Sequence, residues 1–193
     1  GRLGERLQDE ARRLSRLIDD MLDLSQAEAA AHPGQPVALA GLVSEVADAA
    51  RSAAAQAGVN LVVAGIPDEA VVPGDERQLR TMLSNLIDNA VKYSEPESGR
   101  PAPRVEVAAR VEGGEVILEV RDEGIGISEG HQARIFERFY RVDRARSRAT
   151  GGTGLGLSIV RHVARNHGGE VSVESRLGEG SVFRVRLPLW REP

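Results

Sequence analysis

The chain has 193 residues, of which 41% are hydrophobic and 28% charged, and it carries a formal net charge of −4 and no cysteine. These values are typical of a globular protein and give no indication of a nucleic-acid-binding surface or a polybasic membrane arm. Without cysteine the fold has neither disulfides nor thiolate metal sites, which suits a cytoplasmic protein held together by packing alone.

No segment approaches the run of roughly 18 apolar residues that a membrane-spanning helix needs, and the first residues show no signal-peptide pattern. We therefore expect a part that is soluble and not inserted in a membrane. The sequence starts at Gly1 in the middle of a helical pattern. We expect it to be a piece of a longer protein.

Residues 1–31 predict one long amphipathic helix. Two interleaved sets of apolar residues recur every seven positions along it, namely Leu7, Leu14 and Met21, and Leu3, Leu17 and Leu24. Such a seam is typical of helices that pack on other helices, and Ile18 and Leu22 widen it, which favours a bundle of more than two helices. The alternative is a helix that docks on its own domain, but the regular seam and the charged back face favour an intermolecular bundle. Residues 32–36, HPGQP, predict a linker.

Residues 37–190 predict a mixed α/β domain. Helical periodicity covers 39–57, 74–94, 132–140 and 154–169, with Asp75 as a cap of the second helix. Strand patterns cover 59–65 and 71–72. Two hairpins are also predicted, one over 104–122 around Gly113-Gly114 and a closing one that turns at 177–180. The predicted fold class is α+β: a two-layer α/β sandwich whose mostly antiparallel sheet is covered by three helices.

The helix over 74–94 presents two amides on one face, because Asn85 and Asn89 are four residues apart. Asp88 and Lys92 flank them. Amide and carboxylate oxygens suit a hard cation such as Mg²⁺, and a lysine one turn further on suits a phosphate. Taken alone, however, this pattern is equally typical of a solvated polar face.

Two glycine clusters favour a ligand site. In DEGIGI, Gly124 and Gly126 follow a strand, so the backbone can approach a flat ligand closely while Asp122 offers carboxylate oxygens to an amino group. In GGTGLGLSIV, glycines run directly into a helix start, where exposed N–H groups favour an anion such as a phosphate. The cluster lacks the lysine of a phosphate-binding P-loop, and no strand precedes it as a dinucleotide-binding motif requires.

Four motifs, NLIDNAVKY, DEGIGI, FERFYRVD and GGTGLGL, resemble in order and spacing the N, G1, F and G2 boxes of sensor histidine kinases. The ATP-binding domain of that family shares its Bergerat-type fold with Hsp90, gyrase and MutL. The segment ending LIDDMLDLSQAE resembles the second helix of the family's dimerisation and phosphotransfer hairpin. The lid sequence RARSRATGGTGLGL resembles the phosphate-responsive branch.

The resemblance implies a role for each motif. The carboxylate of Asp122 would accept a hydrogen bond from the adenine amine, and Gly124 and Gly126 would let the base lie against the backbone. Asn89, supported by Asn85, would hold Mg²⁺, and Arg141 would offset charge on the γ-phosphate. The resemblance implies that the remaining ATP-contacting residues are Lys92, Tyr93, Ile127, Gly152, Thr153, Gly154, Leu155 and Gly156, with Lys92 and Asn85 also assigned to catalysis beside Arg141. Phe136 and Phe139 are interpreted as packing anchors of the lid.

The sequence departs from the family in one respect, because none of its histidines stands in a His-Glu context. They are His32, His131, His162 and His167, each interpreted as a surface or structural residue. We therefore expect truncation between the two hairpin helices, with the acceptor histidine outside this sequence and no autophosphorylation in cis. Asn85 stands where the related ATPases carry a water-activating glutamate, so hydrolysis should be slow.

The predicted function is an ATP-dependent protein-histidine kinase domain that relays phosphate to a response-regulator aspartate. The parent would be a homodimer through the helical hairpin, anchored in the membrane with this part on the cytoplasmic side. Two alternatives are a nucleotide-binding interaction module without transfer activity and a hydrolysing ATPase of the wider superfamily.

Overall fold

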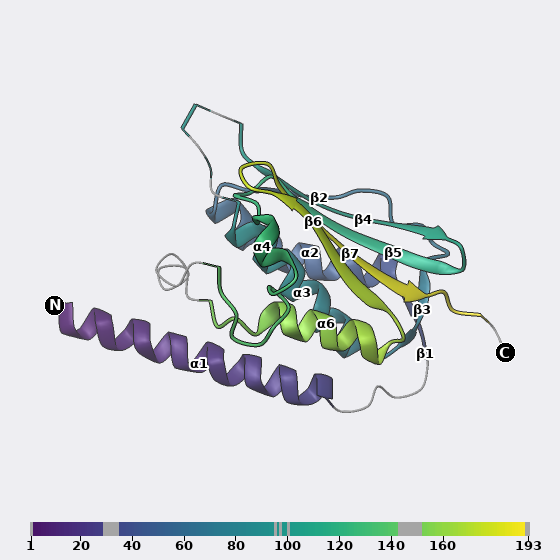
Figure 1. Ribbon diagram of the computed structural model, residues 1–193, viewed down its shortest axis with the longest axis horizontal. Coiled ribbons are helices and arrows are strands. Elements are labelled where there is room, and N and C mark those ends of the chain that lie inside the picture. The colour runs from purple at the N-terminus through teal and green to yellow at the C-terminus, as the bar shows by residue number, and fades with distance from the viewer. Residues whose placement is uncertain are drawn as a thin grey trace.

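The computed structural model describes residues 2–28, 35–94, 96, 98–99, 101–142 and 152–191. Its elements are α1 (Arg2–Glu28), β1 (Gln35–Ala38), α2 (Leu39–Gln56), β2 (Asn60–Val63), β3 (Val71–Gly74), α3 (Glu76–Lys92), β4 (Arg104–Glu112), β5 (Glu115–Asp122), α4 (Glu129–Gln132), α6 (Gly156–Asn166), β6 (Glu170–Arg176) and β7 (Gly180–Pro188). A sheet forms one layer, α2, α3 and α6 form the other, and α1 lies outside them beside α6 (Figure 1). The predicted two-layer α+β fold is confirmed.

The main sheet has the strand order β2-β4-β5-β7-β6. Only β2 and β4 run parallel, and the other neighbours are antiparallel, as predicted. The predicted hairpin over 104–122 turns at Gly113 and Gly114, whose φ angles are 61° and 83°. Two successive positive φ angles are those of a type I′ turn, which glycine adopts without strain and whose twist matches the strands.

Helix α3 places one face in the core and the other at the site. Asp75 caps it by accepting hydrogen bonds from the N–H groups of Arg77 and Gln78 at 2.9 and 3.1 Å. Its apolar residues Leu79, Met82, Leu83, Leu86 and Ile87 are at most 1% exposed. Burial of each such side chain contributes roughly 1.5–3 kcal/mol, which fixes the rotation of the helix. The amides of Asn85 and Asn89 are thereby turned away from the centre of the core.

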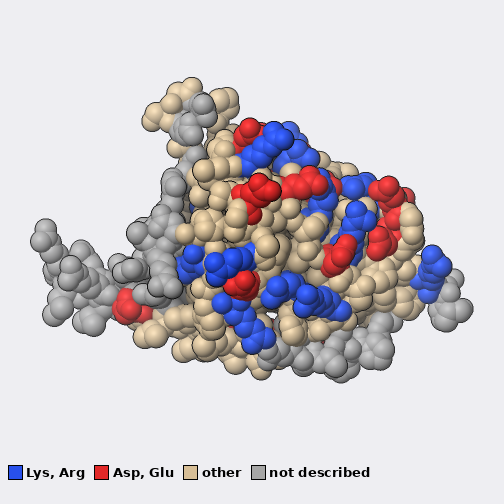
Figure 2. Space-filling model, in the orientation of Figure 1, with Lys and Arg blue, Asp and Glu red and all other residues tan. Residues whose placement is uncertain are grey.

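The outer face of the sheet is covered by paired charges, and Figure 2 shows basic and acidic side chains interleaved over the strands. Glu119 lies at the centre of this network, with its Oε1 2.7 Å from both Arg110 and Arg184. Arg184 also pairs with Glu174 at 2.5 Å. Strand alternation sends these residues outward and their neighbours Leu118 and Val120 into the core.

Helix α1 is confirmed as a long helix, and its two predicted apolar rows face different ways. Leu17 is half-buried, and Leu24 packs against the core of the domain. The side chains of Leu14, Ile18, Met21 and Leu22 are 53–58% exposed. Those of Leu3 and Leu7 lie outside the described part. The row that contains Leu17 and Leu24 therefore docks on the domain, as in the alternative considered above. The other row forms an exposed apolar stripe, and the bundle with other helices stays a prediction that needs this stripe as its contact surface. Within the described ranges, no helix combines the length and apolarity that crossing a membrane would require.

Two local predictions need correction. Strand β1 was not predicted: Gln35 and Pro36, assigned to the linker, pair antiparallel with Gly74 and Pro73 of β3 in a separate two-stranded sheet. The short helix predicted over 132–140 is instead α4 at 129–132, followed by turns. The apolar spacing of Ile135 and Phe136 resembles helical periodicity, but these residues are buried from a turn. His32 and residues 143–151 of the lid lie outside the described residues.

Candidate functional site

A pocket of about 500 Å³ opens between α3, the loop that follows β5 and the segment that leads into α6. It brings together all but two of the residues assigned to the ligand site from the sequence. Those that line it are Asn85, Asn89, Lys92, Tyr93, Asp122, Gly126, Ile127, Arg141, Gly152, Thr153, Gly154 and Gly156. Gly124 and Leu155 do not line it. The four sequence motifs thus converge on one cavity although they are separated along the chain.

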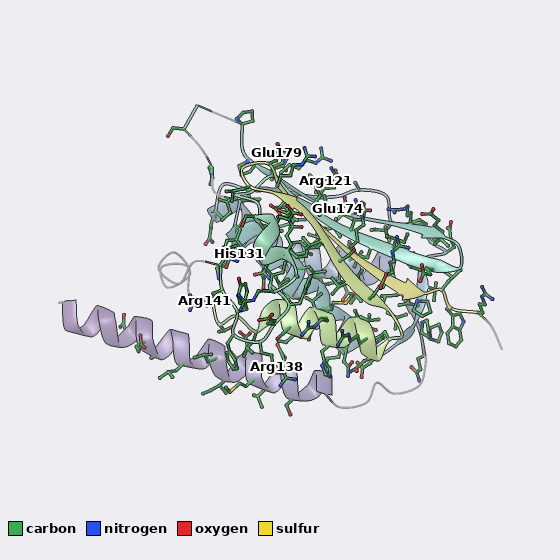
Figure 3. The ribbon with its side chains drawn as sticks, viewed as in Figure 1. Arg121, His131, Arg138, Arg141, Glu174 and Glu179 are labelled. Carbon is green, nitrogen blue, oxygen red and sulfur yellow. The ribbon has the colours of Figure 1, made fainter. Side chains whose placement is uncertain are left out.

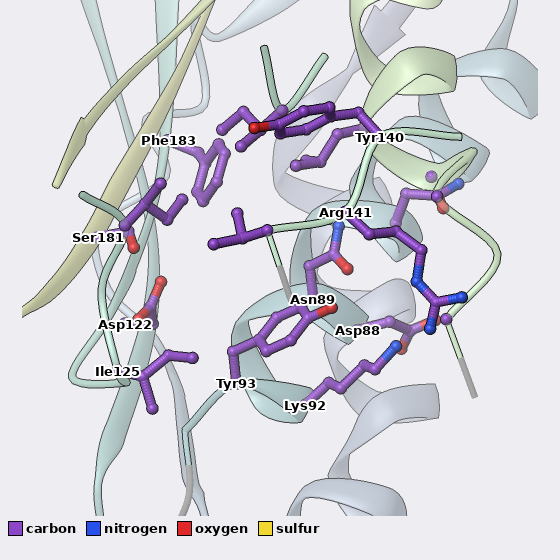
Figure 4. A pocket seen from close by; sticks show the side chains of 18 of the residues that line it. Asp88, Asn89, Lys92, Tyr93, Asp122, Ile125, Tyr140, Arg141, Ser181 and Phe183 are labelled. Atoms are coloured by element: carbon purple, nitrogen blue, oxygen red, sulfur yellow. The ribbon is translucent and has the colours of Figure 1, made fainter. Parts of the chain in front are cut away.

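One end of the pocket is an apolar slot with a single carboxylate. Figure 4 shows Asp122 grouped with Ser181, Ile125 and Phe183 at this end. Asp122 is 6% exposed, and its Oδ1 accepts a hydrogen bond from the Gly124 N–H at 2.9 Å. A buried carboxylate that lines a pocket suits a flat ligand that bears an amino group.

Burial raises the pKa of Asp122 to about 6, although hydrogen bonds from Gly124 and Ser181 oppose the shift. The cause is desolvation, since an ionised carboxylate loses solvation when it leaves water. The shift marks Asp122 as a group whose charge is maintained at a cost to the fold. Perturbed carboxylates of this kind cluster in ligand and catalytic sites.

The opposite end gathers cationic and amide side chains. Figure 4 places Lys92, Arg141 and Asp88 there, with Asn89 and Tyr93 between the two ends. The Lys92 ammonium lies 5.2 Å from the centroid of the Tyr93 ring, a cation–π distance that keeps the lysine over the pocket. Burial raises the pKa of Asp88, which was noted as a neighbour of the amides but not assigned to the site. This end is suited to anionic groups.

A hydrogen bond within α3 fixes the orientation of the Asn85 amide. The Asn85 Nδ2 donates to the Thr81 carbonyl at 2.9 Å, so its oxygen turns the other way, towards Gly156. A Cβ at Gly156 would lie 2.6 Å from that oxygen and 3.8 Å from the Asn89 Nδ2. The described residues contain no group of three or more His, Cys, Asp or Glu side chains that could hold a metal unaided. An ion here would need oxygens from its ligand, as Mg²⁺ commonly does with phosphates.

The glycines of the DEGIGI loop allow protein segments to pack closely. A Cβ at Gly124 would lie 2.3 Å from the Tyr93 carbonyl oxygen, and one at Gly126 would lie 1.9 Å from that of Arg176. The loop is fastened to the turn between β6 and β7 by the bond from the Gly178 N–H to the Ile125 oxygen at 2.7 Å. The contact of Gly124 and Gly126 with a ligand base remains a prediction.

The glycines of the second cluster, GGTGLGL, have different neighbours. A Cβ at Gly154 would lie 2.9 Å from the backbone of Phe139, so this glycine serves packing. A Cβ at Gly152 would instead lie 2.7 Å from the Lys92 ammonium, at the cationic end of the pocket. Leu155 is fully buried in the core, and its N–H donates to the Thr153 hydroxyl at 3.3 Å.

The aromatic residues before the lid differ from the prediction in one case. Phe136 is a packing anchor, 7% exposed and in edge contact with Phe183. Phe139 is not, because it is 58% exposed and has a left-handed φ of 62°. Its N–H donates to the Gly154 carbonyl at 2.9 Å, and this bond holds the strained residue in place.

Two histidines have structural partners. His131, on α4 in Figure 3, contacts the Tyr140 hydroxyl at 2.5 Å, and Tyr140 lines the pocket. His167 is 6% exposed; one ring nitrogen donates to the Val163 carbonyl at 2.8 Å and the other accepts from the Asp75 N–H at 3.0 Å. His162 is half-buried on α6.

Other pocket residues were not assigned from the sequence. They are Asp20, Asp88, Ile125, Ser128, Ile135, Tyr140, Val142, Leu157, Leu177, Ser181 and Phe183. Five of them, Asp88, Ile125, Tyr140, Val142 and Leu157, lie within the four motifs but were given no role at the ligand. Ser181 and Phe183 could have been found from register, since β7 pairs Ser181 directly with Asp122. Asp20 could not, because it comes from the distant helix α1.

Comparison with known proteins gives a consistent result. A family model described as "Histidine kinase-, DNA gyrase B-, and HSP90-like ATPase" matches residues 74–191. The chain is 39% identical over 194 residues to a "Sensor-like histidine kinase SenX3" of Mycolicibacterium smegmatis, covering 100% of the chain and 49% of that protein. It is 38% identical to a "Phosphate regulon sensor protein PhoR" of Pseudomonas aeruginosa, covering 93% of the chain and 40% of that protein.

A solved structure entitled "Crystal structure of ShkA full-length in complex with AMPPNP" matches with a TM-score of 0.77 and 32% identity. The match covers 97% of the chain and 38% of that protein. The chain therefore spans half or less of the length of these relatives.

Proposed function

Because the chain belongs to the histidine kinase-, DNA gyrase B- and HSP90-like ATPase family, we propose that it is the ATP-binding catalytic domain of a sensor histidine kinase. The observation that carries the proposal is the polarised pocket, with the buried Asp122 at one end and Lys92 and Arg141 at the other. The adenine amine would donate to Asp122, and the triphosphate would extend along α3 to the cationic end.

The reaction is transfer of the γ-phosphoryl group to a histidine outside these residues. The bond from the γ-phosphorus to its bridging oxygen breaks, a bond to the imidazole nitrogen forms, and a base beside the acceptor takes the imidazole proton. Lys92 and Arg141 bind the tail and offset the charge that develops on it. Asn89 and Asn85 would hold Mg²⁺, which supplies further neutralisation of the phosphates.

Asn85 distinguishes transfer from hydrolysis. Its amide cannot take a proton from water at neutral pH, and its Nδ2 is already engaged by the Thr81 carbonyl. ATP should therefore persist in the pocket until an acceptor arrives. This supports a kinase over a hydrolysing ATPase of the same family.

The wider assignments are part of the same proposal. We place the parent in the membrane with this part in the cytoplasm, dimeric through a helical hairpin that includes α1 and able to pass its phosphate to a response-regulator aspartate. The exposed stripe of Leu14, Ile18, Met21 and Leu22 supports a helical partner. The similarity to PhoR supports the phosphate-responsive branch.

The test is calorimetric binding of Mg²⁺-ATP followed by labelling from γ-labelled ATP, with a hairpin peptide that carries an acceptor histidine. ATP should bind, label should appear on the peptide, and free phosphate should accumulate slowly. Asn89→Ala should remove the Mg²⁺-dependent part of the affinity. Binding without any labelling would favour the interaction module, and steady phosphate release that Asn85→Ala abolishes would favour the hydrolysing ATPase.

A further inference from the structure

Helix α1 contributes an acidic side chain to the pocket. Asp20 lines the cavity, and its carboxylate accepts a hydrogen bond from the hydroxyl of Thr153, which is 133 residues away in the chain. The same hydroxyl accepts the Leu155 N–H at 3.3 Å. Asp20 therefore joins α1 to the segment that ends the lid and begins α6.

This carboxylate lies at the cationic end of the pocket. Thr153 follows Gly152, the residue whose Cβ would lie 2.7 Å from the Lys92 ammonium. Helix α6 begins three residues later, and its N-cap, Leu155, makes no side-chain capping bond. The first N–H groups of a helix carry partial positive charge and favour an anion. Asp20 thus supplies an anionic group where the proposed function places phosphates.

The docked face of α1 carries further acid. Burial raises the pKa of Asp23, and the neighbouring Asp20 and Asp19 raise it again, with Arg77 opposing. Helix α1 therefore carries a group of neighbouring acidic side chains, and Asp20 is the one of the three that lines the pocket. A polyphosphate entering the same end would meet this charge at short range in a partly dehydrated site, where Coulomb repulsion is poorly screened.

We propose that Asp20 is a tethered competitor of the phosphate tail, so that docking of α1 and binding of triphosphate antagonise each other. The inference rests on the proposed function, since it concerns the phosphate end of the same pocket. Antagonism between two binding events is reciprocal: α1 weakens ATP binding by the same factor by which ATP weakens docking of α1. Release of Asp20 from Thr153 would then accompany ATP loading.

The first experiment compares Asp20→Asn with the matched control Asp19→Asn on the same helix. Asparagine can still accept the Thr153 hydrogen bond, so Asp20→Asn removes only the charge. Asp19 is exposed, and it does not line the pocket. Titration calorimetry should show on the order of tenfold tighter ATP binding for Asp20→Asn, less for ADP and no change for adenosine, with Asp19→Asn near wild type. Equal affinities in the two variants, or an equal gain for adenosine, would overturn the inference.

The second experiment measures the reciprocal effect by hydrogen exchange of α1. ATP should accelerate exchange of the α1 amides in the wild type, whereas adenosine should not. Protection of α1 by ATP would contradict antagonism. If the wild type binds neither ATP nor adenosine, the proposed function is refuted. The inference is then tested separately by measuring the binding of inorganic tripolyphosphate, which needs no base site. Tripolyphosphate must bind Asp20→Asn more tightly than wild type for the inference to stand.

Discussion

Strand β5 carries two acidic residues, Glu119 and Asp122, in opposite environments. An odd separation of three residues turns them to opposite faces of the sheet. Glu119 faces outward between Arg110 and Arg184, both 2.7 Å from its carboxylate. Asp122 faces the pocket, and its bonds there come from Gly124 and Ser181 rather than from a cation.

The two carboxyls respond in opposite directions. Burial alone would raise the pKa of Glu119, but hydrogen bonds from Arg110 and Arg184 outweigh it and lower the pKa below its usual range. Burial raises that of Asp122 to about 6. The outer carboxylate is charged because its partners stabilise it, whereas the inner one remains charged at neutral pH at the expense of the fold. Stability and ligand recognition are therefore separated across the two faces of one strand.

The largest expected effect concerns the pH dependence of unfolding. The folded pKa of Asp122, about 6, exceeds the ordinary 3.8, so ionisation destabilises the fold. The penalty is absent below pH 3.8, grows as pH rises and is complete above about 6; it amounts to about 3 kcal/mol. Between pH 4 and 7.5, urea unfolding should show the wild type losing about 2–3 kcal/mol relative to Asp122→Asn. A pH-independent difference between the two proteins would contradict this assignment.

The second prediction tests whether the charge of Asp122 serves ligand binding. Asp122→Asn should bind adenosine about ten- to a hundredfold more weakly at pH 8, because a hydrogen bond from the adenine amine to a charged acceptor is lost. Asp88→Asn is the matched control. It also removes a buried carboxylate with a raised pKa, but at the other end of the pocket, and should leave adenosine affinity unchanged. Calorimetry measures both, and equal losses would remove the distinction between the two ends.

The third prediction uses pH in place of a substitution. Ligand binding favours the ionised Asp122, so adenosine affinity should fall about tenfold for each pH unit below 6 and level off above it. Adenosine is the better probe here because it has no phosphate that titrates in the same range. Calorimetry between pH 5 and 8 should show this profile for the wild type and a flat one for Asp122→Asn. A flat wild-type profile would place the base elsewhere.

The smallest expected effect lies on the outer face. Glu119→Gln should lower the unfolding free energy by about 1 kcal/mol at neutral pH, since two arginines lose their shared ionic partner. The contribution is present above pH 4.5 and lost as pH falls through the lowered pKa. Glu174→Gln removes an end of the network whose side chain is 71% exposed, and should cost less. ATP affinity should not change in either variant, and a loss would show that the two faces are coupled.

Much of the fold was predictable because its signals are local. The type I′ turn at Gly113-Gly114, the Asp75 cap and the apolar face of α3 each depend on residues a few positions apart. Strand β1 was missed because its four residues acquire strand geometry by pairing with β3, some 35 residues later. The helix predicted over 132–140 failed since the apolar residues Ile135 and Phe136 are buried from a turn.

Some residues of the site were likewise predictable from local signals, and others were not. Asn85, Asn89 and Lys92 share a helix face, and Asp122 ends a strand, so their motifs could be read directly. Leu155 was assigned to the ligand from the family resemblance, but its apolar side chain is fully buried in the core. Phe139 was expected to pack, but the left-handed backbone beside Gly154 turns it outward.

Most of the elements, the motifs and the chemical identity of the groups that meet in the pocket follow from the sequence alone, because periodicity, turn residues and side-chain chemistry are properties of short segments. The three-dimensional fold was needed to show that Asp122 is buried without a cation, that Glu119 lies between two arginines, and that Asp20 of α1 reaches Thr153. Charge energies depend on distance and on solvent exclusion, and both are set by which distant segments the fold brings together.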